Sequence, residues 1–278
     1  NRLLAGIVLI GLMMRLSGIF WGVPLFDPHA QAYHPDEPKI IGGGYLFPED
    51  ILTRTDLRYP TACHYALGAL TWPFKTIMIQ EGRDPFWHIY VFARLISVLL
   101  GTATILLVYA IAKSLYGPRC AIIASFLIAF SMLHVTNSAW ATTDVATSFF
   151  LAAFFFFLHK TPHSDILSLL CGIALGLLIG AKYTGGIAVV ALGTFLLISA
   201  HYQEKRLSVG TAYRAIADRR LWIILGTSTV VFLISTPGVL INTQAFLDSI
   251  ESERNRMSHL ALPLWDPAVW KKQFLALS

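Results

Sequence analysis

The stretch YVFARLISVLLGTATILLVYAIAK, residues 90–113, decides the fold class, because a predominantly apolar run of this length can cross a bilayer as a helix. Six further apolar runs cover residues 3–23, 120–135, 145–158, 166–181, 187–200 and 221–237. Of the 278 residues, 55% are hydrophobic and only 13% are charged, whereas soluble domains average about 25% charged residues. These features predict an all-α polytopic membrane protein with seven spans.

The polar stretches between these runs predict how the chain is organised. We expect a single transmembrane domain over residues 1–278, with long outer loops at 24–89 and 238–278. Within the first loop, the half-apolar residues 61–80 predict helices that lie in the membrane interface, and the triplet Gly42–Gly44 predicts a turn. Because the chain begins without methionine, we expect an N-terminal fragment of a longer protein.

The distribution of basic residues predicts the orientation. If residue 1 faces the cytoplasm, the densest basic cluster, residues 201–220, is also cytoplasmic, as the positive-inside rule requires. Both long polar loops then lie on the opposite face, which indicates the cytoplasmic (inner) membrane with the functional face outward. The sequence pI of about 9.2 does not indicate a nucleic-acid partner, because the basic residues lie in loops between apolar runs.

The most informative polar segment is Tyr33-His34-Pro35-Asp36-Glu37-Pro38, directly after the first apolar run. Two adjacent carboxylates at a membrane edge are functional candidates, since they are costly to place near lipid. The flanking prolines stiffen the pair. The functional reading is a general base whose neighbour orients it or shares a metal with it; the alternative is a pair of loop acids that face water.

A second acid, Asp144, ends the segment Asn137-Ser-Ala-Trp-Ala-Thr-Thr-Asp144 between two spans. The predicted orientation places this short turn on the outer face, together with Asp36. An aspartate after two threonines also fits a helix N-cap. The two roles are compatible, and both stay open.

Two cations are predicted on the same face. Lys182 lies in the outer turn Ala181-Lys-Tyr-Thr-Gly185, and Arg58 precedes Tyr59-Pro60. A cation in a tight outer turn can bind a lipid phosphate, and it can also extend to the headgroups without a specific ligand. Arg15 lies inside the first run and is expected to face the bundle interior, whereas Arg94 is expected to mark the start of a span.

The remaining candidates carry weaker signals. His34, His64 and His134 have no i, i+4 spacing that would indicate a metal site. If a divalent metal binds, Asp36 and Asp144 are its expected ligands. The phenylalanines at 149–150 and 154–157 are expected to be lipid-facing bulk.

The motifs recur in an order that resembles the family 39 type of membrane glycosyltransferase, the GT-C class that includes protein O-mannosyltransferases and aminoarabinose transferases. The matching segments are His34-Pro35-Asp36-Glu37, Arg58-Tyr59-Pro60, Ala93 to Ser97, Leu115-Tyr116-Gly117, His134 to Asp144, Ala181 to Gly185 and Thr236-Pro237-Gly238. The resemblance covers nearly the whole chain. The sequence departs from the family pattern after the first loop, where Tyr59-Pro60-Thr61-Ala62 replaces the usual Pro-Pro-Leu or Pro-Ser-Leu. This difference weakens the donor-side role inferred for Arg58.

The resemblance implies a GT-C helical bundle and a hexosyl- or pentosyltransferase that moves one mannose-like sugar from a polyprenyl-phosphate carrier to an acceptor hydroxyl, with inversion. It implies the following roles: catalytic, Asp36, Glu37 and Asp144; donor-phosphate binding, Lys182, Tyr183 and Arg58; acceptor or pocket contacts, His34, Asn137 and Thr143. The implied partners are the donor, a protein, lipid or glycan acceptor, and membrane lipid.

Two other functions stay open at this point. A transporter would use intramembrane charges such as Arg15 and Asp144 to line a substrate path, although the inverted repeats typical of transporters are not visible. A non-catalytic assembly subunit would leave the paired acids without a role.

Overall fold

The computed structural model describes residues 2–22, 34–49, 51, 54, 56–204 and 208–260. The expectations for residues 23–33 and 261–278 of the two outer loops lie outside this part. Every regular element in the described ranges is a helix, which confirms the all-α prediction. The helices are α1 (Arg2–Leu16), α2 (Glu37–Tyr45), α4 (Ala62–Gln80), α5 (Phe86–Tyr116), α6 (Pro118–Phe130), α7 (Met132–Ser138), α8 (Thr143–Lys160), η1 (Thr161–His163), α9 (Asp165–Ala181), η2 (Tyr183–Ile187), α10 (Ala188–Glu204), α11 (Val209–Ala217), α12 (Arg219–Ser235), α13 (Gly238–Ile241) and α14 (Thr243–Leu260).

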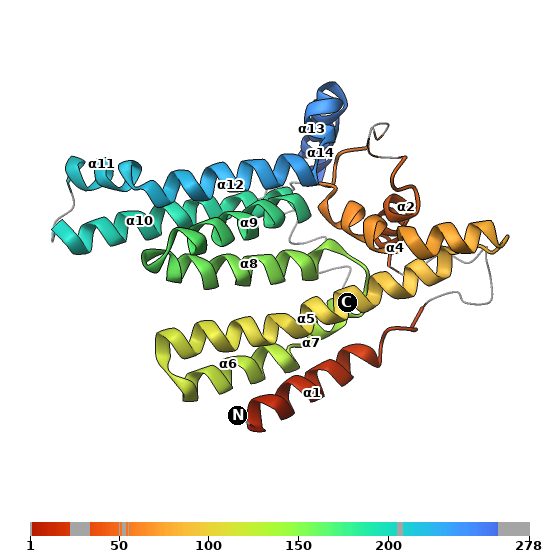
Figure 1. Ribbon diagram of the computed structural model, residues 1–278, viewed down its shortest axis with the longest axis horizontal. Coiled ribbons are helices and arrows are strands. Elements are labelled where there is room, and N and C mark those ends of the chain that lie inside the picture. Colours follow the sequence, from red (N-terminus) through yellow and green to blue (C-terminus); the bar gives the residue numbers. More distant parts are fainter. Residues whose placement is uncertain are drawn as a thin grey trace, which may run out of the picture.

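The long helices form a bundle in which α8, α9, α10 and α12 lie together and α1, α5 and α6 form a second group (Figure 1). Helices α2, α4, α13 and α14 gather at one end of this bundle (Figure 1). These four helices come from the two segments that the sequence predicts as outer loops. They therefore bring the first and last polar parts of the chain to the same end.

The apolar character of the helices supports a membrane location. Among the described residues, Phe86–Tyr116 and Tyr183–Tyr202 are long and apolar enough to cross a membrane. A third span is possible if α6 and α7, which meet at a bend of 57°, count as one. The apolar run 120–135 thus covers two helices rather than one straight helix, and the break lies at Ser131, whose backbone is extended.

A buried arginine stabilises this break. Arg15 has no exposed surface, and its guanidinium donates to the carbonyl oxygens of Ile128 at 3.2 Å and Ala129 at 3.1 Å. It also contacts His134 Nδ1 at 2.9 Å. The last carbonyls of a helix have no partner within that helix, so Arg15 satisfies acceptors that the break at Ser131 leaves open. The expectation that Arg15 faces the bundle interior is correct.

We expect Arg15→Met to destabilise the protein by about 1–3 kcal/mol, because buried carbonyls of α6 lose their donor. Thermal unfolding of the detergent-solubilised protein measures this loss. Lys113→Met, on the exposed surface of α5, is the matched control and should change the midpoint little. Equal midpoints for the two variants would contradict the role given to Arg15.

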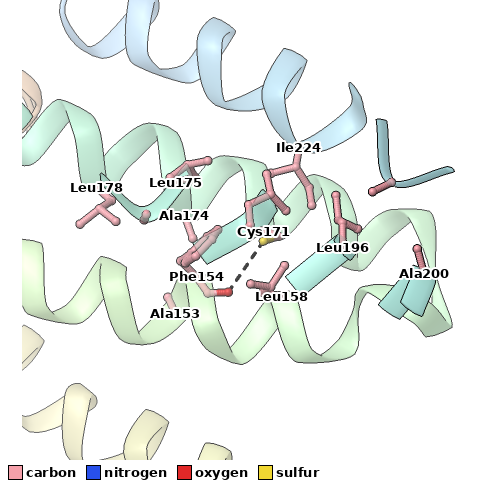
Figure 2. Close-up of a cluster of buried hydrophobic side chains, with 13 residues drawn as sticks. Ala153, Phe154, Leu158, Cys171, Ala174, Leu175, Leu178, Leu196, Ala200 and Ile224 are labelled. Carbon is pink, nitrogen blue, oxygen red and sulfur yellow. Dashed lines mark hydrogen bonds between the residues drawn. The ribbon is translucent and has the colours of Figure 1, made fainter. Parts of the chain in front are cut away.

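The largest core cluster lies between α8, α9, α10 and α12. Figure 2 shows Phe154 of α8 pointing toward Cys171 and Leu175 of α9, with Ile224 of α12 and Leu196 of α10 nearby. Phe154 has no exposed surface, so its expected lipid-facing position is wrong. A run of adjacent phenylalanines on one helix points in many directions, because successive helical residues are about 100° apart. Phe154 lies fully inside the core, and Phe150 and Phe157 pack partly against it.

The glycine triplet is part of α2 and not a turn. Gly43 and Gly44 are buried, and a Cβ atom on them would come within 2.4 Å of His64 and 2.8 Å of Leu67, respectively. Both neighbours belong to α4. The glycines therefore allow α2 to approach α4 closely, and this packing outweighs their low helix propensity.

Candidate functional site

A cavity of about 480 Å³ is lined by residues of α2, the segment 58–60, the start of α8, η2 and α14. Asp36, Asp144 and Lys182 all line it. These residues come from the start of α2, the start of α8 and the junction between α9 and η2. The folded chain thus brings together three side chains that are up to 146 positions apart in the sequence.

Asp36 holds the N-cap position of α2. Its Oδ1 atom accepts hydrogen bonds from Lys39 Nζ at 3.1 Å and from the Tyr59 hydroxyl at 3.4 Å. Its backbone N–H donates to His34 Nδ1 at 3.2 Å. The carboxylate is 41% exposed, so it is oriented by its neighbours and still accessible from the cavity.

Glu37 lies behind the cavity and does not line it. Its side chain has no exposed surface and accepts four hydrogen bonds of 2.7–2.8 Å, from Arg94 Nε and Nη2, the Tyr90 hydroxyl and the Ala141 N–H. Each of its two carboxylate oxygens accepts two of these hydrogen bonds. The residue is therefore placed to fix the start of α2, and with it the neighbouring Asp36, rather than to contact a substrate in the cavity.

Arg94 is the centre of this buried network. In addition to Glu37, it donates to the carbonyl oxygens of Ile19 and Trp21 at 2.8 and 2.7 Å, and it lies 4.8 Å from the ring centre of Trp140. It connects the residues after α1 with α2, α5 and the turn before α8. Its expected role as a span boundary is wrong, because the boundary of α5 lies at Phe86 and Arg94 is completely buried.

Asp144 is the second residue of α8 and not its N-cap. The N-cap is Thr142, whose side chain makes no capping hydrogen bond. The Asp144 carboxylate accepts from Lys182 Nζ at 2.7 Å, and both side chains are about half exposed. Asp144 therefore lies in the first turn of α8 and in the cavity, paired with Lys182.

Tyr183 and Arg58 also line the cavity, although each has a protein partner. The Tyr183 hydroxyl donates to the carbonyl oxygen of Leu57 at 2.9 Å. Arg58 binds both carboxylate oxygens of Asp56, at 2.9 and 2.7 Å. The side-chain hydrogen bond from Arg58 lowers the pKa of Asp56 to about 2, and the same bond raises the pKa of Arg58. This ion pair is therefore complete at neutral pH and holds Arg58 in place.

Only some of the other predicted site residues line the cavity. Thr143 lines the cavity, whereas His34 and Asn137 do not. His34 instead supports the backbone of Asp36 and packs against Trp140 with ring centres 5.6 Å apart. Among the residues that the structure describes, no group of three or more histidine, cysteine, aspartate or glutamate side chains could hold a metal ion.

Several lining residues have no role in the sequence analysis. They are Lys39, Tyr59 and Thr142, together with Glu253, Arg254 and Arg256 of α14. The spacing of Asp36 and Lys39 is a usable signal, since an i, i+3 pair shares one helix face. No comparable signal identifies the α14 residues, because their position depends on how the last described helix packs over the first loop.

The cavity carries more positive than negative groups. The lining cations are Lys39, Arg58, Lys182, Arg254 and Arg256, and the lining acids are Asp36, Asp144 and Glu253. Each of these acids pairs with one lining cation. Arg254 makes no ion pair within the described part of the chain, so its charge is available to an anion.

Comparison with known proteins defines the class. Residues 87–217 match the sequence profile of the dolichyl-phosphate-mannose-protein mannosyltransferase family. The protein O-mannosyltransferase Pmt1-Pmt2 complex of S. cerevisiae, bound to the sugar donor, has a similar structure, with a TM-score of 0.61, 20% sequence identity and coverage of 88% of this chain. The curated proteins give no match.

The fold is therefore that of a GT-C integral membrane protein, as the sequence predicts. The profile match over residues 87–217 and the similar structure both support the resemblance to protein O-mannosyltransferases stated from the motifs. The chain spans 34% of the length of the similar S. cerevisiae chain.

Proposed function

We propose that the protein is a membrane glycosyltransferase that moves one mannose-like sugar from a polyprenyl-phosphate carrier to an acceptor hydroxyl. The observation that carries this proposal is the shared cavity of Asp36, Asp144 and Lys182, with its excess of cations. The cavity suits an anionic donor and also offers carboxylates for proton transfer. The matched family is named for a dolichyl-phosphate-mannose donor, and the similar structure holds a sugar donor.

The proposed reaction is a single displacement with inversion at the anomeric carbon. The Asp36 carboxylate takes the proton of the acceptor hydroxyl, and the acceptor oxygen attacks the anomeric carbon. The bond between that carbon and the phosphate oxygen breaks, and its electron pair leaves with the polyprenyl phosphate. Lys182 and Arg254 stabilise the charge that develops on the phosphate, while Lys39 and Tyr59 orient Asp36 for the proton transfer.

The remaining residues support this chemistry in distinct ways. Asp144 holds Lys182 at 2.7 Å and is the proposed second acid near the acceptor. Tyr183 and Arg58 border the phosphate side, and Thr143 contacts the acceptor. Glu37 fixes the loop that carries Asp36. In this proposal, the base and the phosphate cations act from opposite sides of the reacting carbon, as an inverting displacement requires.

The proposed location is the cytoplasmic membrane, with the cavity on the outer face. The described basic residues of the cluster at 201–220 lie in the last turn of α10, in α11 and at the start of α12, at the end of the bundle away from α2 and α4 (Figure 1). With that cluster in the cytoplasm, the cavity faces outward, and the whole domain of seven proposed spans crosses the bilayer.

Reconstitution in liposomes tests the proposed function. The full chain is incubated with polyprenyl-phosphate mannose and, in parallel, with a serine- and threonine-containing peptide, a glycan and a lipid acceptor. We expect one acceptor class to gain a mannose while an equal amount of polyprenyl phosphate appears. An unchanged donor with every acceptor would contradict the proposal.

We expect Lys182→Gln to lower kcat/KM for the donor by about ten- to a hundredfold, because a neutral amide stabilises the departing phosphate less well than an ammonium group. Initial rates over a range of donor concentrations measure the effect. Lys113→Gln removes an exposed lysine of α5 outside the cavity and serves as the control. An equal change in both variants would show that Lys182 acts only through the overall charge.

A further inference from the structure

Thr142 holds the N-cap position of α8 but does not cap the helix. Its backbone is extended, with φ −114° and ψ 166°, as is usual for this position. A threonine there normally accepts a hydrogen bond from the N–H of the second or third helical residue, which are Asp144 and Val145 in α8. The Thr142 side chain makes no such bond. Its hydroxyl is therefore not used to begin the helix.

The Thr142 hydroxyl also has no other partner. The residue is only 7% exposed, and within the described part of the chain its buried Oγ1 atom makes no hydrogen bond. By contrast, the buried threonines Thr71, Thr104 and Thr161 each donate to a backbone carbonyl oxygen. A buried hydroxyl without a partner costs free energy. This cost indicates that a ligand supplies the missing hydrogen bond.

Thr142 lines the cavity of the proposed active site, and its chain neighbours define its place there. The preceding residue, Ala141, donates its N–H to Glu37 Oε1 at 2.7 Å, and Glu37 is directly next to the proposed base. Two residues after Thr142, the Asp144 carboxylate accepts from Lys182 Nζ at 2.7 Å. Thr142 thus lies between the base and the proposed phosphate cation. In the proposed reaction, the sugar occupies this part of the cavity.

A hydroxyl of the sugar is the ligand group that suits this position. The threonine hydroxyl both donates and accepts hydrogen bonds, and so does a sugar hydroxyl. Phosphate oxygens need donors, and Lys182 and Arg254 already provide charged ones in the proposed mechanism. A rotation between staggered rotamers about the Cα–Cβ bond turns the Thr142 hydroxyl toward the cavity without a change in the backbone.

We propose that Thr142 is a specificity-determining residue, whose hydroxyl forms a hydrogen bond with one hydroxyl group of the donor sugar. The inference rests on the proposed function, because that function supplies the sugar. A site that hydrogen-bonds a substrate hydroxyl rejects the analogue that lacks it, since the buried protein group is then left unpaired. Thr142 therefore selects the donor at one carbon of the sugar ring.

Binding to the full chain in nanodiscs, without acceptor, tests this contact. The ligands are polyprenyl-phosphate mannose, donors that lack one sugar hydroxyl at a time, and polyprenyl phosphate without a sugar. We expect Thr142→Val to weaken binding of the mannose donor about tenfold and to leave polyprenyl phosphate binding unchanged. One of the deoxy donors should bind the unsubstituted protein equally weakly, and Thr142→Val should not distinguish it from the mannose donor.

Two further variants are matched controls. Thr142→Ser keeps the hydroxyl and should keep the affinity for the mannose donor. Thr104 of α5 is also buried but lies outside the cavity, and its hydroxyl donates to the Leu100 carbonyl oxygen at 2.8 Å. Thr104→Val should change neither affinity. The unfolding midpoint of ligand-free Thr142→Val should equal or exceed that of the unsubstituted protein, because a methyl group replaces an unpaired buried hydroxyl.

The outcomes separate this inference from the proposed function. Equal affinities of Thr142→Val and the unsubstituted protein for the mannose donor would overturn the inference. An equal loss for the mannose donor and for polyprenyl phosphate, or a lower unfolding midpoint with such a loss, would also overturn it. The expected binding pattern together with no sugar transfer would keep the contact and refute the proposed function, whereas normal transfer with equal affinities would refute the contact alone.

Discussion

Asp36→Asn should abolish sugar transfer, with a loss of about 10³-fold or more in kcat. General base catalysis typically contributes 10²–10⁴-fold, and the amide cannot take the proton of the acceptor hydroxyl. Asparagine has nearly the same shape and can still accept hydrogen bonds from Lys39 and Tyr59. Donor affinity and the unfolding midpoint should therefore stay close to those of the unsubstituted protein.

The control for this variant is Asp248→Asn. Asp248 is an exposed acid of α14 that does not line the cavity and contacts Gln244. It tests whether loss of one negative charge at this end of the bundle is sufficient to stop transfer. Normal turnover by Asp36→Asn, or an equal loss in Asp248→Asn, would remove Asp36 from the role of base.

The second large effect concerns stability. Glu37→Gln should destabilise the protein by about 3–5 kcal/mol, because removal of one partner leaves the charge of Arg94 buried without compensation. Neither side chain of this pair has any exposed surface, so solvent cannot screen the loss. The unfolding midpoint in detergent measures it. Lys39→Gln, which breaks the exposed pair with Asp36, should change stability by less than about 1 kcal/mol.

A double variant distinguishes charge compensation from other roles of Glu37. Glu37→Leu combined with Arg94→Met replaces the ion pair by apolar groups and should recover part of the stability lost in Glu37→Gln. Recovery will be incomplete, because the carbonyl oxygens of Ile19 and Trp21 also lose their donor. A double variant that is less stable than Glu37→Gln would contradict the view that the buried charge is the main cost.

The sequence identifies the residues of the cavity better than those that hold it in place. Asp36, Asp144 and Lys182 stand out because charges at the ends of apolar runs are costly unless they have a function. The positive-inside rule then predicts a common face for them. Their convergence on one cavity is a tertiary property, and the ordered motifs of the GT-C resemblance are the information that anticipates it.

Arg94 and Glu37 show what the sequence alone does not reveal. An arginine near the start of an apolar run has the same local pattern whether it reaches the headgroups or binds a carboxylate 57 positions away. Likewise, the adjacent acids Asp36 and Glu37 are equivalent in the sequence, yet one faces the cavity and the other is buried. Such differences arise because α2 begins between them, and successive helical side chains point in different directions.

The most direct test of the central claim is a structure of the protein bound to a non-reactive polyprenyl-phosphate sugar. We expect the phosphate within hydrogen-bond distance of Lys182 Nζ and the anomeric carbon between that phosphate and the Asp36 carboxylate. A sugar bound outside the cavity, or one with Asp36 on the same side of the anomeric carbon as the phosphate, would contradict the account.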